Sequence, residues 1–377
     1  MSAPYQGLKI VELARVLAGP WIGQTMADLG ADVLKVESPK GDETRAWGPP
    51  FITIDGDEFS AYFLACNRGK DSLVADFTNE DDLAHVRALC ASADVVIENF
   101  KVGGLAKYGL DYDSLSAVNP KLIYASVTGF GQEGPYAHRA GYDYLIQGMG
   151  GIMDLTGDPD GPPQKMGVAF TDIFTGLYGV IAIQAALRHR DLNGEGQHID
   201  LALYDSIVGV LANQGMNALV GGQSPTRMGN AHPNICPYAV FPAKEGHFIL
   251  AVGNDGQFAR FCAAFGLADL PEQDAFATNQ ARVANRDRLT AILCDVTSQL
   301  SLDDILQRCE AHTVPAAPIN SVNDALADPQ IAHRDMIVDI DGTSYIKSPI
   351  RFSKSSLRLD KKAPALGNVS ADDILKK

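Results

Sequence analysis

The sequence lacks the cysteine patterns of disulfide-rich and zinc-binding proteins. Its six cysteines are scattered along the chain, and none belongs to a CxxC pair or to the His/Cys spacing of a zinc site. We interpret them as reduced core residues of a cytosolic protein and expect no metal centre. The six are Cys66, Cys90, Cys236, Cys262, Cys294 and Cys309.

Membrane and export signals are also missing. No uninterrupted apolar run approaches the ~20 residues that a bilayer-spanning helix needs. The N-terminal segment MSAPYQGLKIVELA enters the first predicted strand almost at once, which leaves no room for a signal or transit peptide. We therefore expect a soluble, cytoplasmic protein with no membrane partner.

Basic tracts are absent as well. The formal net charge is −15 over 377 residues, so most of the surface would repel the phosphates of a nucleic acid. We expect no nucleic-acid partner. An anion site must then be built locally from lysines, arginines and backbone amides.

The beginning of the chain predicts an α/β fold. An apolar strand at residues 8–12 is followed by a helix at 21–29 and by a second strand that ends at Glu37. This order implies parallel strands joined by a right-handed crossover. The connecting loop has one glycine, Gly19, where the dinucleotide fingerprint needs three. A nicotinamide or flavin site is disfavoured, and a nucleotide lying across the strand ends remains open.

A second unit of this kind ends in the strand DVVIENF. Asn99, Lys101 and Lys107 follow that strand's carboxyl end, which is where ligands bind in open α/β sheets. The sequence therefore predicts a ligand near these three residues.

Residues 40–70 form a long irregular segment that carries Arg45 and Arg68. Long irregular stretches in compact proteins are often functional. A guanidinium can hold a carboxylate or a phosphate with two hydrogen bonds. The alternative for each arginine is a surface ion pair without a ligand.

Asp172 opens an apolar helix that we expect to reach about His189. A carboxylate there lies at the positive end of the helix, and the alternative is that it only caps the helix. Gly176 and Gly179 lower helix propensity, so we expect another backbone to approach that face closely. Upstream, glycines and aromatic residues alternate over 129–151, which is typical of a loop that approaches something closely.

Near residue 221 the sequence becomes rich in proline and glycine. Beyond it, residues 238–255 predict a hairpin that turns at 244–246, and several helical segments follow. We predict a separate smaller domain at 226–322.

These pieces, taken together and in this order, resemble the family III CoA-transferases, also called the formyl-CoA transferase or carnitine-CoA-transferase-like family. The sequence is most similar in pattern to the family's succinyl-CoA:dicarboxylate members. The stretches that carry the resemblance are RVLAGP at 15–20, GADVLKVE at 30–37, DETRAWGPP at 42–50, NRGK at 67–70, VIENF at 96–100, GFGQEGPY at 129–136, RAGYD at 139–143, GVAFTDIFTGLY at 167–178 and GNAHPNICPY at 229–238.

The resemblance implies a large Rossmann-like parallel-sheet domain made of residues 1–205 and 331–377. A smaller α+β domain at 226–322 would be inserted through linkers at 206–225 and 323–330. Two such chains would be threaded through each other as an interlocked homodimer.

The resemblance also implies the chemistry. Asp172 would be the nucleophile, forming an aspartyl anhydride and then an aspartyl-CoA thioester, with no metal or redox cofactor. Coenzyme A would be a substrate, held by Val16, Leu17, Ala18, Ser38, Asn99, Phe100, Lys101, Lys107, Ala140, Gly141 and Tyr142. We expect a succinate-like donor and a C4 to C6 diacid acceptor, with Arg45, Arg68, His232 and Asn234 on the acid side.

Two departures from the family pattern bear on specificity. Some members have an arginine where this chain has Ser38, so one phosphate or adenine contact differs. Formyl-CoA transferases have a run of glycines where this chain has residues 232–235, which argues against formyl-CoA and oxalate. The alternative for His232 is a hydrogen bond that stabilises the turn.

Two other functions remain to be weighed. An α-methylacyl-CoA racemase needs a histidine that can exchange a proton near neutral pH. Where the racemase-like pattern has this histidine, this chain has Tyr142, whose unperturbed pKa of ~10 makes it a poor substitute. His138 is close in sequence but at a different position. The other alternative is a CoA-binding protein without catalysis, against which the retention of Asp172 argues.

Overall fold

The computed structural model describes residues 2–375, which divide into two compact units. The first unit consists of 2–152, 165–223 and 329–375, and the second consists of 153–164 and 224–328. Each unit is described by itself below.

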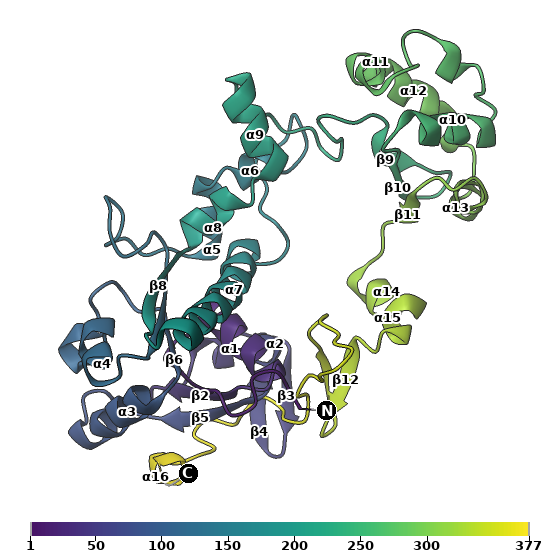
Figure 1. Cartoon of the computed structure of the whole chain (residues 1–377). Helices are drawn as coiled ribbons and strands as arrows, with labels where there is room; N and C mark the ends of the chain where they lie inside the picture. Colours follow the sequence, from purple (N-terminus) through teal and green to yellow (C-terminus); the bar gives the residue numbers. More distant parts are fainter. Residues whose placement is uncertain (1, 376–377) are drawn as a thin grey trace. The chain divides into compact units, whose positions relative to one another are not determined.

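A six-stranded parallel sheet forms the centre of the first unit, as the sequence predicts (Figure 1). If these strands are numbered 1 to 6 along the chain, they lie in the order 3-2-1-4-5-6, which is the order of dinucleotide-binding folds. The order reverses between β1 and β6, so the loops after these two strands diverge and leave a crevice at their carboxyl ends. From one edge to the other, the strands are β5 (Lys70–Val74), β2 (Asp32–Glu37), β1 (Lys9–Glu12), β6 (Val95–Glu98), β7 (Ile123–Thr128) and β8 (Gln197–Ala202).

Helices cover both faces of this sheet. Strand side chains alternate between the two faces, and the apolar residues of one face pack with α1 (Ala18–Asp28) and α7 (Phe170–Asn193). Those of the other face pack with α3 (Glu80–Ser92) and α4 (Tyr112–Val118), where α16 (Ala371–Leu375) also contributes.

The helices α1 and α7 lie unusually close together because of two glycines. A Cβ atom added to Gly176 would lie 3.1 Å from the Ala18 carbonyl oxygen, and one added to Gly179 would lie 2.3 Å from Ile22 Cδ1. The close approach that the sequence predicts on this face is therefore present.

By length and composition alone, α7 could cross a membrane, with a mean hydropathy of 1.4 over its most apolar part. A helix in the core of a globular unit passes the same test, and α7 packs on α1 and on the sheet. Its outer face nevertheless exposes apolar side chains, which are Leu177, Tyr178 and Ile181.

Shorter elements complete the first unit. The segment after β2 contains η1 (Glu43–Ala46), the hairpin of β3 (Phe51–Ile54) and β4 (Asp57–Ser60), and α2 (Ala61–Cys66). The others are η2 (Ala106–Tyr108), α5 (Asp143–Met149), α8 (Leu203–Gly209), α9 (Ala212–Gly221), α15 (Pro329–His333) and the hairpin of β12 (Ile337–Ile340) and β13 (Thr343–Ile346). The short helix α6 (Ile152–Leu155) begins at the end of the first unit and belongs mostly to the second.

The second unit has its own core around a three-stranded antiparallel sheet, ordered β11, β10, β9. The predicted hairpin is formed by β9 (Tyr238–Pro242) and β10 (His247–Ala251), and β11 (Ala316–Pro318) adds the third strand. The remaining elements are α10 (Asp255–Ala264), η3 (Leu270–Glu272), α11 (Asn279–Ala284), α12 (Arg286–Thr297), α13 (Leu302–Ala311) and α14 (Val322–Leu326).

The unit boundaries differ in detail from the predicted domains. Residues 206–225, predicted as a linker, are largely helical, because α8 and α9 occupy them. Residues 153–164, predicted inside the large domain, group with the second unit.

Candidate active site

An open cleft lies within the first unit, at the carboxyl ends of the central strands. Its walls come from the loop after β1, the loop after β6, the segment 127–129 and the segment 137–143, with Asp172 from α7 and Leu203 from α8. This is the crevice that the reversal of strand order creates.

Most of the residues that the sequence assigns to CoA and catalysis meet in this one cleft. The structure brings together Asp172, Val16, Leu17, Ala18, Asn99, Phe100, Lys101, Ala140, Gly141 and Tyr142. Backbone approach within the cleft wall is close, since a Cβ added to Gly129 would lie 2.5 Å from the Gly141 Cα. The glycine-rich segment therefore packs against itself at this point.

Two of the predicted CoA residues do not line the cleft. Ser38 is exposed, and its hydroxyl donates to the Gly41 carbonyl over 3.3 Å. The Lys107 ammonium lies over the ring of Tyr108, 4.5 Å from its centroid.

Arg45 and Arg68 also lie outside the cleft lining, and both are already paired with carboxylates of the protein. Arg45 donates twice to Glu37, over 2.7 and 2.8 Å. Arg68 is buried and donates twice to Asp28, over 2.6 and 3.2 Å. We therefore withdraw both from the acid side of the site and regard them as structural ion pairs.

His232 and Asn234 belong to the second unit, in the loop before β9. The backbone N–H of Asn234 donates to His232 Nδ1 over 3.1 Å, and the His232 ring lies 5.2 Å from the ring of Tyr238. This is the turn-stabilising hydrogen bond that we weighed for His232. A substrate contact of either residue stays a proposal.

Asp172 lies in the first turn of α7, but the cap of this helix comes from another residue. Asp143 Oδ1 accepts hydrogen bonds from the backbone N–H groups of Thr171, over 2.8 Å, and of Asp172, over 3.3 Å. Gln147 donates to the other Asp143 oxygen over 2.7 Å and holds it in place. The helix therefore does not depend on the Asp172 carboxylate for its cap.

The electrostatic environment changes the acidity of Asp172. Burial raises the pKa of Asp172 to about 7, and the negative charge of Asp143 contributes to the same shift. Tyr62 is affected by the same carboxylates, because burial and the negative charges of Asp172 and Asp143 raise the pKa of its phenol. Near neutral pH, Asp172 is thus a carboxylate that is easily protonated, in a site where Tyr62 keeps its proton.

Asp143 is the site residue that sequence reasoning missed. Asp143 entered only as the last residue of the RAGYD stretch, because the backbone groups that it caps follow 28 and 29 positions later. No local spacing signals a cap that is supplied from so far away in the sequence.

Comparison with known proteins gives the site a context. The model of CoA-transferase family III matches residues 5–369. The chain belongs to CoA-transferase family III. The resemblance found in the sequence is thereby confirmed, and the chain is an enzyme of that family.

Individual relatives of this CoA-transferase cover nearly its whole length. It is 55% identical to the succinate–glutarate CoA-transferase of Agrobacterium fabrum, over 98% of this chain and 94% of that protein. It is 38% identical to the succinyl-CoA:glutarate CoA-transferase of Homo sapiens, over 97% and 84%. Among solved structures, it resembles a CaiB/BaiF family protein from Brucella suis with a TM-score of 0.91 and 59% identity, over all of both chains.

Replacing Asp143 with asparagine should shift the pH dependence of this CoA-transferase. The amide keeps an oxygen that can accept from Thr171 and Asp172, but it removes the charge that raises the pKa of Asp172. The acidic limb of the kcat/KM profile should then move to lower pH by about half to one unit.

The matched control for this shift is Asp113→Asn, on α4 at the opposite face of the sheet. Its profile should overlay the wild type when kcat/KM is measured from pH 5 to 9. A limb that stays in place in Asp143→Asn, or moves to higher pH, would contradict the assigned coupling.

Proposed function

We propose that this family III CoA-transferase moves CoA from a succinate-like acyl-CoA donor to a C4 to C6 dicarboxylate, with Asp172 as the covalent carrier. The observation that carries the proposal is the position of Asp172, whose partly buried carboxyl lines the same cleft as the loops after β1 and β6. The names of relatives over 30% identical, which are succinate–glutarate and succinyl-CoA:glutarate CoA-transferases, support the choice of acids.

In the first half of the proposed reaction, an Asp172 oxygen attacks the thioester carbonyl carbon of the donor. The carbon–sulfur bond breaks, CoA leaves as a thiolate and a mixed anhydride remains. The thiolate then attacks the Asp172 side-chain carbon, the donor acid leaves as a carboxylate, and an aspartyl-CoA thioester is formed.

In the second half, the acceptor carboxylate attacks the aspartyl-CoA thioester and again releases the CoA thiolate. The thiolate attacks the acceptor's carbonyl carbon in the new anhydride, which yields acceptor acyl-CoA and restores the Asp172 carboxylate. Anhydrides hydrolyse in water, so the partial burial that raises the pKa of Asp172 also suits the carrier role. Backbone N–H groups would stabilise the oxyanions.

Substrate choice can be tested with a panel of acyl-CoA donors and free acids. We expect succinyl-CoA with glutarate or another C4 to C6 diacid to give the highest kcat/KM, measured by chromatography of the CoA esters. Monocarboxylates of the same length serve as the matched control. A clear preference for aromatic or branched monoacids would remove the dicarboxylate proposal.

The racemase alternative has one observation in its favour, since His138 lines the cleft together with Asp172. A separate experiment tests it, in which the protein is incubated with a 2-methylacyl-CoA in deuterated water. If Asp172 acts as a carrier, no deuterium should appear at the α carbon of the thioester. A protein that binds CoA but transfers it to no acid would support the non-catalytic alternative.

We also propose that two chains form the interlocked homodimer, in the cytoplasm. Apolar side chains on two helices of the first unit support an assembly, because they are exposed to solvent in the single chain. They are Leu177, Tyr178 and Ile181 on α7 and Met216, Leu219 and Val220 on α9.

A further inference from the structure

The loop after β1, which forms one wall of the cleft, contains a residue in an unfavourable backbone conformation. Val16 has φ = 71°, in the left-handed region. A β-branched residue rarely occupies this region, and such strain persists only where the surroundings impose it. The contacts of this loop identify what imposes it.

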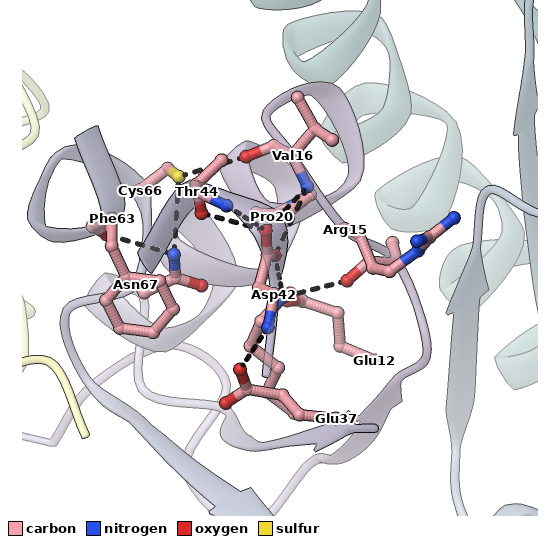
Figure 2. Close-up of polar contacts among 12 residues, drawn as sticks. Glu12, Arg15, Val16, Pro20, Glu37, Asp42, Thr44, Phe63, Cys66 and Asn67 are labelled. Carbon is pink, nitrogen blue, oxygen red and sulfur yellow. Dashed lines mark hydrogen bonds and ion pairs between the residues drawn. The ribbon is translucent and has the colours of Figure 1, made fainter. Parts of the chain in front are cut away.

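Three side chains hold the backbone at Val16 and at Arg15 before it. The Val16 N–H donates to the Asp42 carboxylate, over 3.2 Å to Oδ2, and the Val16 carbonyl accepts from the Cys66 thiol over 3.6 Å. Asn99 binds both backbone groups of Arg15: its Oδ1 accepts from the Arg15 N–H over 2.9 Å, and its Nδ2 donates to the Arg15 carbonyl over 2.7 Å. Figure 2 shows Asp42 next to the Val16 backbone.

Asp42 is itself fixed in a buried position. It accepts from the N–H of Thr44 over 3.0 Å and from its hydroxyl over 2.8 Å, and it pairs with the Lys35 ammonium at 2.9 Å. Burial alone would raise the pKa of Asp42, but Lys35 and Thr44 outweigh it and lower that pKa. The group that faces the Val16 N–H is therefore a charged carboxylate, which is a strong acceptor.

The backbone of Asp42 is supported through Arg45. The Asp42 N–H donates to Glu37 Oε2 over 2.8 Å, and Arg45 holds the same Glu37 carboxylate with two hydrogen bonds. Arg45, which the sequence suggested as a substrate ligand, thus supports the loop instead.

Two buried lysines bracket the loop at its ends. Lys35 donates to the Ala14 carbonyl over 2.8 Å, and Lys70 donates to the Pro20 carbonyl over 2.9 Å. Both ammonium groups also contact Glu12. The backbone from residue 14 to residue 20 is thus attached to buried groups before, at and after Val16.

We propose that Asp42 is a positioning residue that holds Val16 in its left-handed conformation and so shapes the CoA-binding wall of the cleft. This inference rests on the proposed function only in assigning this wall to CoA. If Asp42 were absent, the loop would relax to an ordinary conformation, and CoA would have to rebuild the left-handed one on binding.

A double-mutant cycle between residues 42 and 16 tests this, with CoA affinity measured by titration calorimetry and transfer kinetics beside it. Asp42→Ala should weaken CoA binding about tenfold and raise KM more than it lowers kcat. Glycine adopts the left-handed region without strain, so in a Val16→Gly background the same Asp42→Ala change should weaken binding by less than about twofold. Asp42→Asn keeps an acceptor oxygen and should lose less affinity than Asp42→Ala.

Two further variants separate positioning from folding. Asp42→Ala/Lys35→Met removes one buried charge of each sign, so it should fold even if Asp42→Ala does not. Because Lys35 also holds the Ala14 carbonyl, the double variant should lose at least as much affinity as Asp42→Ala, and Val16→Gly should recover the part that comes from Asp42. Thr313→Gly removes another β-branched residue with positive φ, 53°, in the second unit, and it should leave CoA affinity unchanged.

The inference would be overturned if Asp42→Ala lost equal CoA affinity in the wild-type and Val16→Gly backgrounds. It would also be overturned if the Asp42→Ala variant bound CoA as tightly as the wild type. A wild type that binds CoA but transfers it to no acid would defeat the proposed function and leave the cycle informative. A wild type that binds no CoA would overturn both.

Discussion

Asp172→Ala should abolish CoA transfer while leaving the protein folded. The reaction proposed here passes through two covalent bonds to this carboxyl, which is the acidic side chain of the first turn of α7. Removing a covalent carrier of this kind should lower kcat by roughly 10⁴-fold or more. Exchange of isotopically labelled succinate into succinyl-CoA is the direct measurement.

Trapping identifies the carrier independently of rate. Hydroxylamine or borohydride added during turnover should modify position 172 in the wild type and nothing in Asp172→Ala, as read by peptide mass spectrometry. Asp205→Asn, on α8, is the control and should keep wild-type exchange. Substantial exchange by Asp172→Ala, or a label at another residue, would disprove the mechanism.

Asp172→Asn provides the check that loss of activity is not loss of fold. Because the folded-state pKa of Asp172 is raised from 3.8 to about 7, ionisation of this group costs stability as pH rises from about 4 through 7. The asparagine variant has no charge to bury. Its melting temperature should therefore be at least that of the wild type at pH 8.

Glu12→Gln should produce the largest loss of stability. The fully buried Glu12 carboxylate contacts two fully buried ammonium groups, Lys35 at 3.1 Å and Lys70 at 2.9 Å. The α1 backbone lies so close that a Cβ added to Gly23 would be 1.8 Å from Glu12 Oε2, which leaves no room for solvent to replace the lost charge. The variant should lower the free energy of unfolding by about 3–5 kcal/mol, measured by urea denaturation.

The two lysines show how closely balanced this cluster is. Burial would lower the pKa of Lys35, but Glu12 and Asp42 outweigh it and raise that pKa, whereas burial prevails at Lys70 and lowers its pKa. Glu12→Gln/Lys70→Met, which removes one charge of each sign, should recover part of the loss.

Glu43→Gln is the matched control, because Glu43 pairs with Arg15 at 2.6 Å while both side chains are about half exposed. It should cost no more than about 1 kcal/mol. If Glu12→Gln lowered the free energy of unfolding no more than Glu43→Gln, the buried cluster would not stabilise the fold as we expect.

The fold and most of the cleft could be predicted because their signals are local. Alternating strand and helix patterns indicate parallel strands, and the carboxyl end of one such strand places Asn99 at the crevice. Val16 and Asp172, which line the same crevice, were assigned through the family resemblance. The paired glycines of α7 likewise predict its close contact with α1. The inferences on the strands, on Asn99 and on the glycines need only the order and spacing of neighbouring residues.

What could not be predicted depends on partners that are distant in the sequence. Arg68 has the guanidinium of an anion site, but its carboxylate partner, Asp28, lies 40 positions earlier and is buried with it. The left-handed Val16 was also hidden, because valine disfavours that conformation and the carboxylate that imposes it is 26 positions away. Residues 206–225 were assigned to a linker, although they are largely helical.

The contact between Cys66 and the Val16 carbonyl has a consequence for acyl chemistry. A thiolate so near the cleft could capture the acyl group by transthioesterification and hold it on the wrong atom. Burial raises the pKa of Cys66 to about 12, so its sulfur stays protonated and is a weak nucleophile. The protonated sulfur therefore does not compete with Asp172 in the proposed reaction, and it serves as a hydrogen-bond donor to the Val16 carbonyl.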